Sequence, residues 1–388
     1  MSEDANAAGS DDRGPTAGDR SRATRTDEPV VSLDGVEVHF TKERLLGFAG
    51  SETVRAVDGV SFDVYENDVV ALVGESGCGK TTLGKTAIGV QRPTGGTLRY
   101  RGQDVWATKD DGPPEGGYTH DEIRQALQII HQDPGSSLNP NYTVRSALAA
   151  PLKQWRSDMS EADRQARIYG LLEHVGMSPA SDYAERYPHQ LSGGEQQRVA
   201  LLRALLMNPD VILADEAVSA LDVSLRVEMM DLFLELQDEF DTSYVFISHN
   251  LANAKYLTQK ADGRIGIMYL GELVEIGTPE QIIHDPQHPY TKVLLWATAD
   301  VHSHGEVEEP PVRSLDIPDP ADPPSGCRFH TRCPEAREAC KRASPELTDY
   351  DGDGRRTACF RNDEDHEYWE SEPLEDEEDD VQMNALSD

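Results

Sequence analysis

The sequence predicts an α/β fold built around a mostly parallel sheet, and two observations support that prediction. Short apolar runs that suit buried strands, such as "VVALV" (69–73) and "DVILAD" (210–215), alternate with amphipathic helical segments. The motif "GESGCGKT" (74–81) follows the first run directly and precedes a segment that can begin a helix. A strand, a glycine-rich loop and a helix in this order form a unit that binds phosphate groups.

The individual elements follow from local patterns. Alternating apolar residues predict a strand at 30–40 and two more within 56–74. A Gly-, Pro- and acid-rich stretch, 104–122, predicts a surface loop. The remaining elements are predicted from periodicity, with helices in 143–176, 195–207 and 222–238 and buried strands at 210–215 and 243–249.

The two ends of the chain differ from its centre. Residues 1–28 have almost no large apolar side chains and are expected to be disordered. From about 285 the sequence becomes Pro-rich and irregular, which indicates a small extension over 285–360. The strongly acidic stretch 361–388 is expected to be a disordered tail.

The formal net charge is −35, from 71 acidic and 36 basic residues. An acidic surface repels nucleic acid, so no nucleic-acid partner is expected. Because the acidic excess is not confined to the tail, the composition favours adaptation to high salt over an ordinary acidic protein.

The chain contains no run of 18 apolar residues, so no membrane span is expected. Its first 18 residues lack the basic and apolar regions of a secretory signal. We therefore expect the protein in the cytosol, where disulfides are rare.

The phosphate-binding loop supplies the first site residues. Its glycines let backbone N–H groups surround phosphate oxygens, and the following helix adds a positive dipole end. Lys80 would pair with the β- and γ-phosphates of a nucleotide, and Thr81 would ligate Mg²⁺. The residues expected to contact the nucleotide here are Gly74, Glu75, Ser76, Gly77, Cys78, Gly79, Lys80, Thr81 and Thr82.

The segment "VILADE" (211–216) provides two carboxylates at the end of a buried strand. Asp215 is expected to hold Mg²⁺, directly or through water. Glu216 is expected to polarise the attacking water.

The segment "LSGGEQQR" (191–198) places Ser192, Gly193 and Gly194 before an amphipathic helix. This is a second helix N-terminus suited to anions. One nucleotide cannot easily use two such termini on one subunit. Two subunits packed head to tail could each offer this turn to the other's γ-phosphate.

Taken together, these motifs, "SALD" (219–222) and His249 resemble the ATP-binding subunit of an ABC transporter over about 30–300. The resemblance implies a P-loop NTPase fold of ABC type at 29–284. This fold combines a mostly parallel core sheet with an antiparallel N-terminal β-subdomain and a helical subdomain at about 133–200. It also implies ATP hydrolysis with Mg²⁺.

The resemblance implies four further roles. Gln132 would reach Mg²⁺ and the attacking water, and His249 would contact the γ-phosphate. Asp222 would link two ATP sites across a dimer. Phe40 would stack on adenine, although an insertion at 42–53 loosens its spacing.

Several shorter sequence motifs resemble those of the oligopeptide/dipeptide importer ATPases. The acidic composition additionally leads us to expect a haloarchaeal source. Ala217 and Gly135 depart from the usual pattern. The motifs are "ESGCGKTTL", "QDPGSSLNP", "ADEAVSALDVS", "HPYTKVLL" and "GCRFHTRCPEAREAC".

The resemblance implies a peripheral subunit on the cytoplasmic face of the membrane. Its expected partners are two permease subunits, an extracellular solute-binding protein and a second similar ATPase subunit, favoured over a second copy of this chain. Peptide is the expected solute, with oligosaccharide or nickel as alternatives. A soluble, non-transport ABC ATPase is a remote alternative, since the chain has one phosphate loop and no heptad run between 81 and 191.

Four of the five cysteines, Cys327, Cys333, Cys340 and Cys359, follow the spacing C-x5-C-x6-C-x18-C. Disulfides, free structural thiols and one tetrathiolate site are the possible interpretations. The spacing does not choose between zinc and a [4Fe–4S] cluster. The resemblance favours the cluster, in a structural role.

Overall fold

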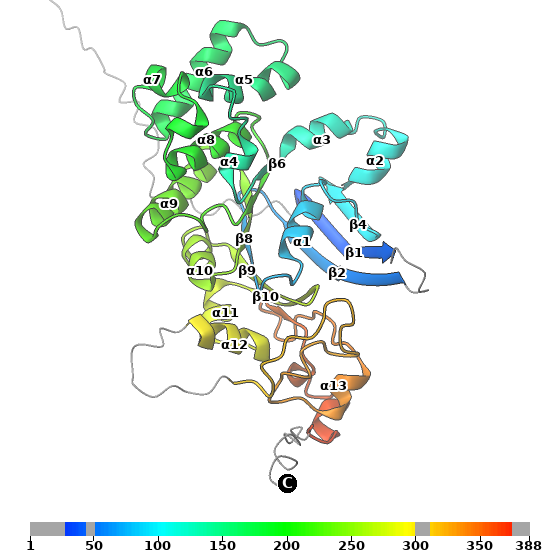
Figure 1. Cartoon of the computed structure of the whole chain (residues 1–388). Helices are drawn as coiled ribbons and strands as arrows, with labels where there is room; N and C mark the ends of the chain where they lie inside the picture. Colours follow the sequence, from blue (N-terminus) through cyan, green and yellow to red (C-terminus); the bar gives the residue numbers. More distant parts are fainter. Residues whose placement is uncertain (1–27, 44–50, 299–310, 375–388) are drawn as a thin grey trace, which may run out of the picture.

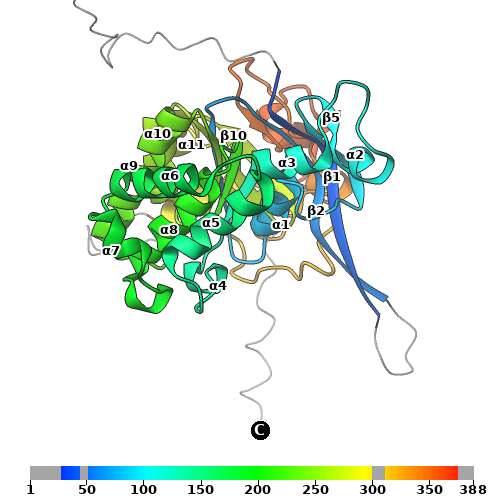
Figure 2. The same ribbon diagram turned by 90° about the horizontal axis from the view of Figure 1, so that it is seen from above.

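The computed structural model describes residues 28–43, 51–298 and 311–374. Figure 1 shows a helical region at one end, two sheets in the middle and the C-terminal extension at the other end. Seen from above in Figure 2, the helical region and the N-terminal strands lie on opposite sides of the core sheet. The predictions for 1–27 and 375–388 lie outside the described residues.

The core sheet has seven strands, and its centre is parallel. β3 pairs in parallel with β8 and β9, and β7 pairs in parallel with β8 and β6. The strands β9, β10 and β11 form an antiparallel edge. In spatial order the strands are β11 (Arg356–Thr357), β10 (Glu272–Gly277), β9 (Arg264–Tyr269), β3 (Val69–Val73), β8 (Ser243–Ser248), β7 (Val211–Asp215) and β6 (Leu127–Ile130).

Both faces of this sheet are buried, which explains why its central strands are continuous apolar runs. Within β3, Val70 and Leu72 pack into one apolar cluster, and Val69, Ala71 and Val73 pack into another. Because side chains alternate along a strand, the two clusters lie on opposite faces of the sheet.

A second, antiparallel sheet covers one of these faces. Its order is β2 (Ser51–Val64), β1 (Val31–Glu43), β4 (Gly95–Tyr100) and β5 (Gln103–Asp104). Helix α1 (Lys80–Ala87) packs in the same apolar cluster as Leu33 and Phe62 of this sheet. The sheet therefore holds the start of α1 against the core.

Helices cover the other face and form the helical region. That region contains α4 (Pro134–Ser137), α5 (Val144–Trp155), α6 (Glu161–His174), α7 (Ala180–Ala184), η1 (Pro188–Gln190) and α8 (Gly193–Leu205). The chain then supplies α9 (Val223–Phe240), α10 (Leu251–Lys260), α11 (Pro279–His284) and α12 (Pro289–Thr298). The predicted α/β fold with an antiparallel N-terminal sheet is confirmed.

The stretch 104–122 is not the loop that its composition suggested. It contains α2 (Val105–Asp111) and the start of α3 (His120–Ala126). Asp104 caps α2 by accepting hydrogen bonds from the backbone N–H groups of Trp106 and Ala107 at 2.9 and 2.8 Å. Thr119 and Glu122 form a capping box on α3. These caps offset the cost of helix initiation in a polar segment.

The C-terminal extension is attached to the sheet edge, where β11 pairs with Glu275 and Ile276 of β10. It also contains α13 (Glu338–Arg342), η2 (Phe360–Asn362) and η3 (Glu367–Glu370). Residues 361–374 pack onto this extension, whereas the sequence predicted disorder from 361 onward. The reason is local, because Tyr368 is buried and Arg361 pairs with Glu335 at 2.6 Å.

The turn between β3 and α1 has little room for side chains. Gly79 has a φ of 105°, a left-handed conformation. A Cβ atom there would lie 2.0 Å from the carbonyl oxygen of Ala56. By contrast, a Cβ atom at Gly170, within the regular helix α6, would meet no described atom within 4 Å apart from its adjacent residues and the nearby backbone of its own helix.

We expect Gly79→Ala to destabilise the protein by more than about 2 kcal/mol, because the left-handed conformation alone costs an alanine ~1–2 kcal/mol and the contact with Ala56 adds to it. The matched control Gly170→Ala should stabilise by roughly 0.5–1 kcal/mol through its helix propensity. Chemical unfolding of both variants measures the difference. Equal stabilities would contradict the packing described for Gly79.

A buried neutral histidine lies where α12 meets the core sheet. His288 is 1% exposed, and its Nδ1 accepts a hydrogen bond from the backbone N–H of Tyr290 at 3.1 Å. Burial lowers the pKa of His288 to about 3, and the charges of Arg361 and Lys292 act in the same direction. The folded protein therefore keeps this imidazole neutral.

We expect the free energy of unfolding to fall as the pH drops from about 6.5 towards 3, because the unfolded chain binds a proton at His288 that the folded chain excludes. His288 alone contributes a slope of up to about 1.4 kcal/mol per pH unit. Denaturant titrations between pH 4 and 7 should show a shallower slope for His288→Asn. The exposed His284→Asn serves as the control, and an unchanged slope in His288→Asn would refute the assignment.

Candidate functional site

The loop at 74–79 connects the buried end of β3 to the first turn of α1, as the sequence predicted. Lys80 is 6% exposed, and its Nζ donates hydrogen bonds to the carbonyl oxygens of Gly74 and Glu75, both at 2.8 Å. The ammonium group thus lies inside the loop. Ser76 and Gly77 are exposed at the rim, while Cys78 is buried beneath them.

The two residues predicted to hold Mg²⁺ in this loop and in β7 meet directly. Thr81 Oγ1 donates a hydrogen bond to Asp215 Oδ1 at 2.9 Å. Hydroxyl and carboxylate oxygens are the ligands that Mg²⁺ prefers. The pair fits the requirements of a magnesium site beside Lys80.

A second group of predicted residues, Gln132, Glu216 and His249, meets around Glu216, the residue that follows Asp215. Glu216 Oε2 accepts a hydrogen bond from Gln132 Nε2 at 2.9 Å and lies 3.7 Å from His249 Nδ1. Glu216 follows β7, Gln132 follows β6 and His249 follows β8. Because these strands are parallel, their carboxyl ends lie on the same side of the sheet. The structure joins Gln132 to Glu216, while Thr81 pairs with Asp215.

The backbone at Glu216 has a φ of 50°, which is uncommon for a residue other than glycine. Its N–H donates to the carbonyl oxygen of Ile247 at 3.2 Å, and its own carbonyl oxygen accepts from Ser219 Oγ at 2.9 Å. These bonds hold the backbone of Glu216 in this unfavourable conformation.

The turn of Ser192, Gly193 and Gly194 begins α8. Ser192 and Gly193 are exposed, and Ser192 forms a capping box with Glu195. The serine backbone N–H donates to Glu195 Oε2 at 2.7 Å. The turn therefore presents a helix N-terminus to the outside of the subunit.

The last two predicted nucleotide residues, Asp222 and Phe40, make no hydrogen bond or ion pair with the residues above in the described parts of the chain. Asp222 caps α9, its Oδ1 accepting from the backbone N–H of Leu225 at 3.0 Å. Phe40 lies in β1 opposite Val54, and it is 43% exposed. An exposed aromatic ring at this place is available for stacking.

The four cysteines of the extension line one small cavity, together with Phe329, Phe360 and Tyr368. All are unbonded thiols, so the disulfide interpretation is not supported. Burial raises the pKa of Cys333 to about 12 and that of Cys359 to about 11. As free thiols they stay protonated at neutral pH and are poor nucleophiles.

The cavity has a volume of about 20 Å³, room for roughly one water molecule. Within the described parts of the chain, no three of the cysteine sulfurs lie within 4.8 Å of one another. Four thiolates around one zinc ion lie closer, about 3.8 Å apart for Zn–S bonds of about 2.3 Å. The predicted cluster stays a prediction, and a single zinc ion would require these side chains to shift.

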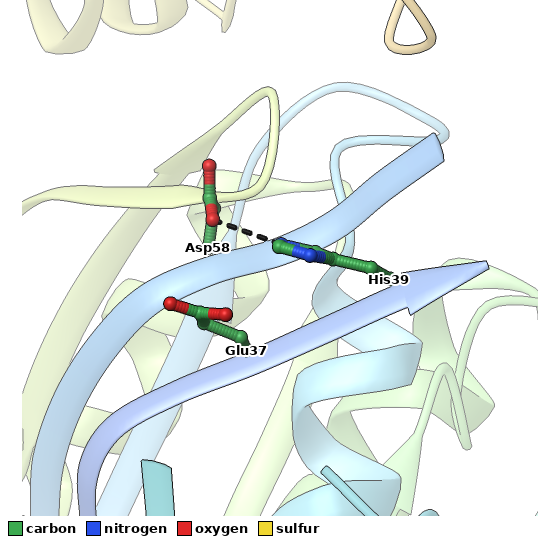
Figure 3. A group of neighbouring side chains, drawn as sticks. All are labelled: Glu37, His39 and Asp58. Carbon is green, nitrogen blue, oxygen red and sulfur yellow. Dashed lines mark hydrogen bonds and ion pairs between the residues drawn. The ribbon is translucent and has the colours of Figure 1, made fainter. Parts of the chain in front are cut away.

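Among the described residues, one group of three potential metal ligands has its ligand atoms within 4.8 Å of one another. It consists of Glu37, His39 and Asp58 (Figure 3). Asp58 accepts a hydrogen bond from His39 Nε2 at 2.9 Å and also contacts Arg328. Burial opposes ionisation of Asp58, but the bonds from His39 and Arg328 lower its pKa. His39 and Arg328 already bind the Asp58 carboxylate, so Asp58 offers little charge to a cation.

Sequence reasoning missed two contacts between the C-terminal region and the phosphate loop. Tyr290 Oη accepts a hydrogen bond from the backbone N–H of Glu75 at 3.0 Å, and Arg332 pairs with the Glu75 side chain at 3.2 Å. The motifs "HPYTKVLL" and "CRFHTRC" mark both segments, but nothing in them shows which surface they contact.

Known proteins resemble this chain over most of its length. The family described as ABC transporter matches residues 57–219, and the family described as oligopeptide/dipeptide transporter, C-terminal region, matches residues 274–340. An oligopeptide transport ATP-binding protein of Bacillus subtilis (AppF) is 39% identical, covering 82% of this chain and 94% of its own. A dipeptide transport ATP-binding protein of Escherichia coli (DppF) is also 39% identical, with coverages of 87% and 96%.

Among solved structures, the ATP-binding cassette MJ0796 bound to ADP and phosphate matches with a TM-score of 0.53 and 28% identity. The match covers 64% of this chain and 98% of the cassette. These similarities do not address the expected high-salt origin, which stays a prediction. The phosphate loop, the two carboxylates after β7 and the matched C-terminal region agree with them, and the chain belongs to the ABC transporter family as an ATP-binding subunit of the oligopeptide/dipeptide type.

Proposed function

We propose that this chain hydrolyses ATP to power the import of peptides across a membrane. The observation that supports this most directly is the joint placement of Lys80, the Thr81–Asp215 pair and Glu216 at one edge of the sheet. Peptide is favoured as the solute because the matched relatives are named for oligopeptide and dipeptide transport.

The residues of this site would have different roles in phosphoryl transfer. Lys80 and the loop N–H groups would hold the β- and γ-phosphates, and Thr81 and Asp215 would hold Mg²⁺, which supplies positive charge to the phosphate oxygens. Glu216 would accept a hydrogen bond from the attacking water and polarise it. Gln132 and His249 both lie next to Glu216. Gln132 would also reach Mg²⁺ and the attacking water, and His249 would contact the γ-phosphate.

The turn at Ser192 would act across a dimer. It is exposed and carries a helix N-terminus, which suits the γ-phosphate bound by a partner subunit. Asp222 would lie at the same interface. We favour a second, similar ATPase subunit over a second copy of this chain.

The remaining partners are two permease subunits and, through them, an extracellular solute-binding protein. None of the helices in the described parts of the chain combines the length and the hydropathy needed to cross a bilayer. The subunit would bind the permeases at the cytoplasmic face of the membrane, with the exposed loop around Gln132 as the contact.

Two alternatives differ in a measurable way. The same machinery could import oligosaccharide or nickel, and purification of the whole transporter with its binding protein would identify the solute. A soluble ABC ATPase would purify without permease subunits. The match of residues 274–340 to the oligopeptide/dipeptide C-terminal region favours the peptide transporter over both.

Glu216→Gln should reduce ATP turnover by about 10²–10⁴-fold while nucleotide binding persists, because the water loses its polarising carboxylate and Lys80 remains. Phosphate release and nucleotide binding, measured on the same preparation, test both parts. The control Glu235→Gln changes an exposed carboxylate on α9 and should turn over like the wild type. A Glu216→Gln protein that hydrolyses ATP at the wild-type rate would exclude Glu216 as the base.

We further propose that the four cysteines bind one metal group, with a [4Fe–4S] cluster as the first candidate and zinc as the second. The support is that all four thiols line one small cavity in an extension of low apolar content. A bound metal group would contribute folding energy there. Its role would be structural.

Protein purified without oxygen should be brown and contain about four irons per chain if all four thiols bind one cluster. Cys333→Ser should lose this metal, whereas Cys78→Ser, which changes the cysteine outside the cavity, should keep it. Colourless protein that contains one zinc per chain would show that the cysteines bind zinc and not a cluster. Protein that carries neither metal would show that the thiols are free.

A further inference from the structure

The segment Cys327–Cys333, "CRFHTRC", connects the cysteine cavity to the ATP-binding domain, and we call it the arginine loop. Two hydrogen bonds fold it tightly, from the His330 N–H to the Cys327 carbonyl oxygen and from the Cys333 N–H to the Phe329 carbonyl oxygen, both 2.9 Å. Its terminal thiols line the cavity, while its two arginines reach residues of the ATP-binding domain.

Arg332 pairs with an acidic residue inside the phosphate loop. Its Nη1 lies 3.2 Å from both carboxylate oxygens of Glu75. The Arg332 side chain is 6% exposed, and its guanidinium lies over the rings of Tyr269 and Phe329, 5.9 and 5.7 Å from their centres. In so closed a place the pair interacts more strongly than one at the surface.

The other polar groups of Glu75 are also bound. Its N–H donates to Tyr290 Oη at 3.0 Å, and its carbonyl oxygen accepts from Lys80 Nζ at 2.8 Å. Tyr290 itself packs on Phe329 of the arginine loop, with ring centres 5.4 Å apart. The first residue after Gly74 is therefore held from both sides.

The second arginine supports the loop indirectly. Arg328 is 6% exposed, pairs with Glu272 at 3.0 Å and donates to the carbonyl oxygen of Leu270. The next residue, Gly271, donates its N–H to the carbonyl oxygen of Cys78 at 2.9 Å. The arginine loop thus braces the β9–β10 turn, which in turn contacts the phosphate loop.

Charge explains why Glu75 needs a partner. A carboxylate in a loop that receives a triphosphate repels the ligand, and the repulsion grows in a partly dehydrated site. Arg332 cancels that charge and directs the carboxylate towards the extension. Without Arg332, the negative charge of Glu75 would remain beside the incoming phosphates.

We propose that Arg332 is a positioning residue for ATP binding, acting through Glu75, so that the C-terminal extension completes the phosphate loop. This inference rests on the proposed ATPase function. Arg332 contacts the loop residue and is not assigned a contact with nucleotide.

The test compares Mg²⁺-dependent binding of the analogue AMP-PNP by calorimetry in full-length variants. Arg332→Met keeps the bulk over Tyr269 and removes the charge, and it should weaken binding about tenfold or more, as loss of one partner of a buried charge pair does. Adding Glu75→Gln to that variant should restore most of the affinity. Arg332→Lys, which keeps the charge, should lie near the wild type.

The charge mechanism also predicts a smaller loss for ADP than for AMP-PNP, which a purely structural role would not produce. Arg342→Ala, which removes an exposed pair with Glu367 in the same extension, is the control and should bind normally. Equal affinity of Arg332→Met and wild type, or no restoration by Glu75→Gln, would overturn the inference. Failure of the wild type itself to bind AMP-PNP would instead count against the proposed function.

Discussion

The parallel pairing of β3, β8 and β7 is the constraint on which the site depends. Parallel strands end at the same edge of a sheet, so the residues that follow them meet there although they are far apart in sequence. Lys80, Asp215 and His249 are each placed by this rule. The burial of both faces of the sheet makes the register hard to change, because a slip by one residue would exchange the two apolar clusters.

The extension uses a different kind of attachment. It adds β11 to the sheet edge by backbone pairing and then inserts Arg328 and Arg332 beside the phosphate loop. Backbone pairing fixes where the segment lies, and the arginines determine which loop it supports. A buried ion pair adds little net stability after dehydration, which is consistent with a role of Arg332 in compensating the charge of Glu75 and not in stabilising the fold.

Much of the fold and of the nucleotide site could be predicted from the sequence because each nucleotide-binding motif lies at the end of a recognisable strand. Lys80, Thr81, Asp215 and Glu216 each follow an apolar run whose length and composition reveal a strand. The left-handed backbone of Glu216 and the pairing of Glu75 with Arg332 could not be predicted, because both depend on three-dimensional contacts. At 104–122 the composition predicted the wrong structure, since helix caps outweighed the polar content.

The arrangement of Arg332 and Glu75 has a consequence for biosynthesis. The two residues are 257 positions apart, and a ribosome adds roughly 5–20 residues per second. The phosphate loop is therefore made on the order of 10–50 seconds before the arginine that completes it. A nascent chain that has reached β10 but not yet Arg332 still carries an uncompensated Glu75, so on this proposal its affinity for ATP would stay about tenfold lower until the arginine loop is made.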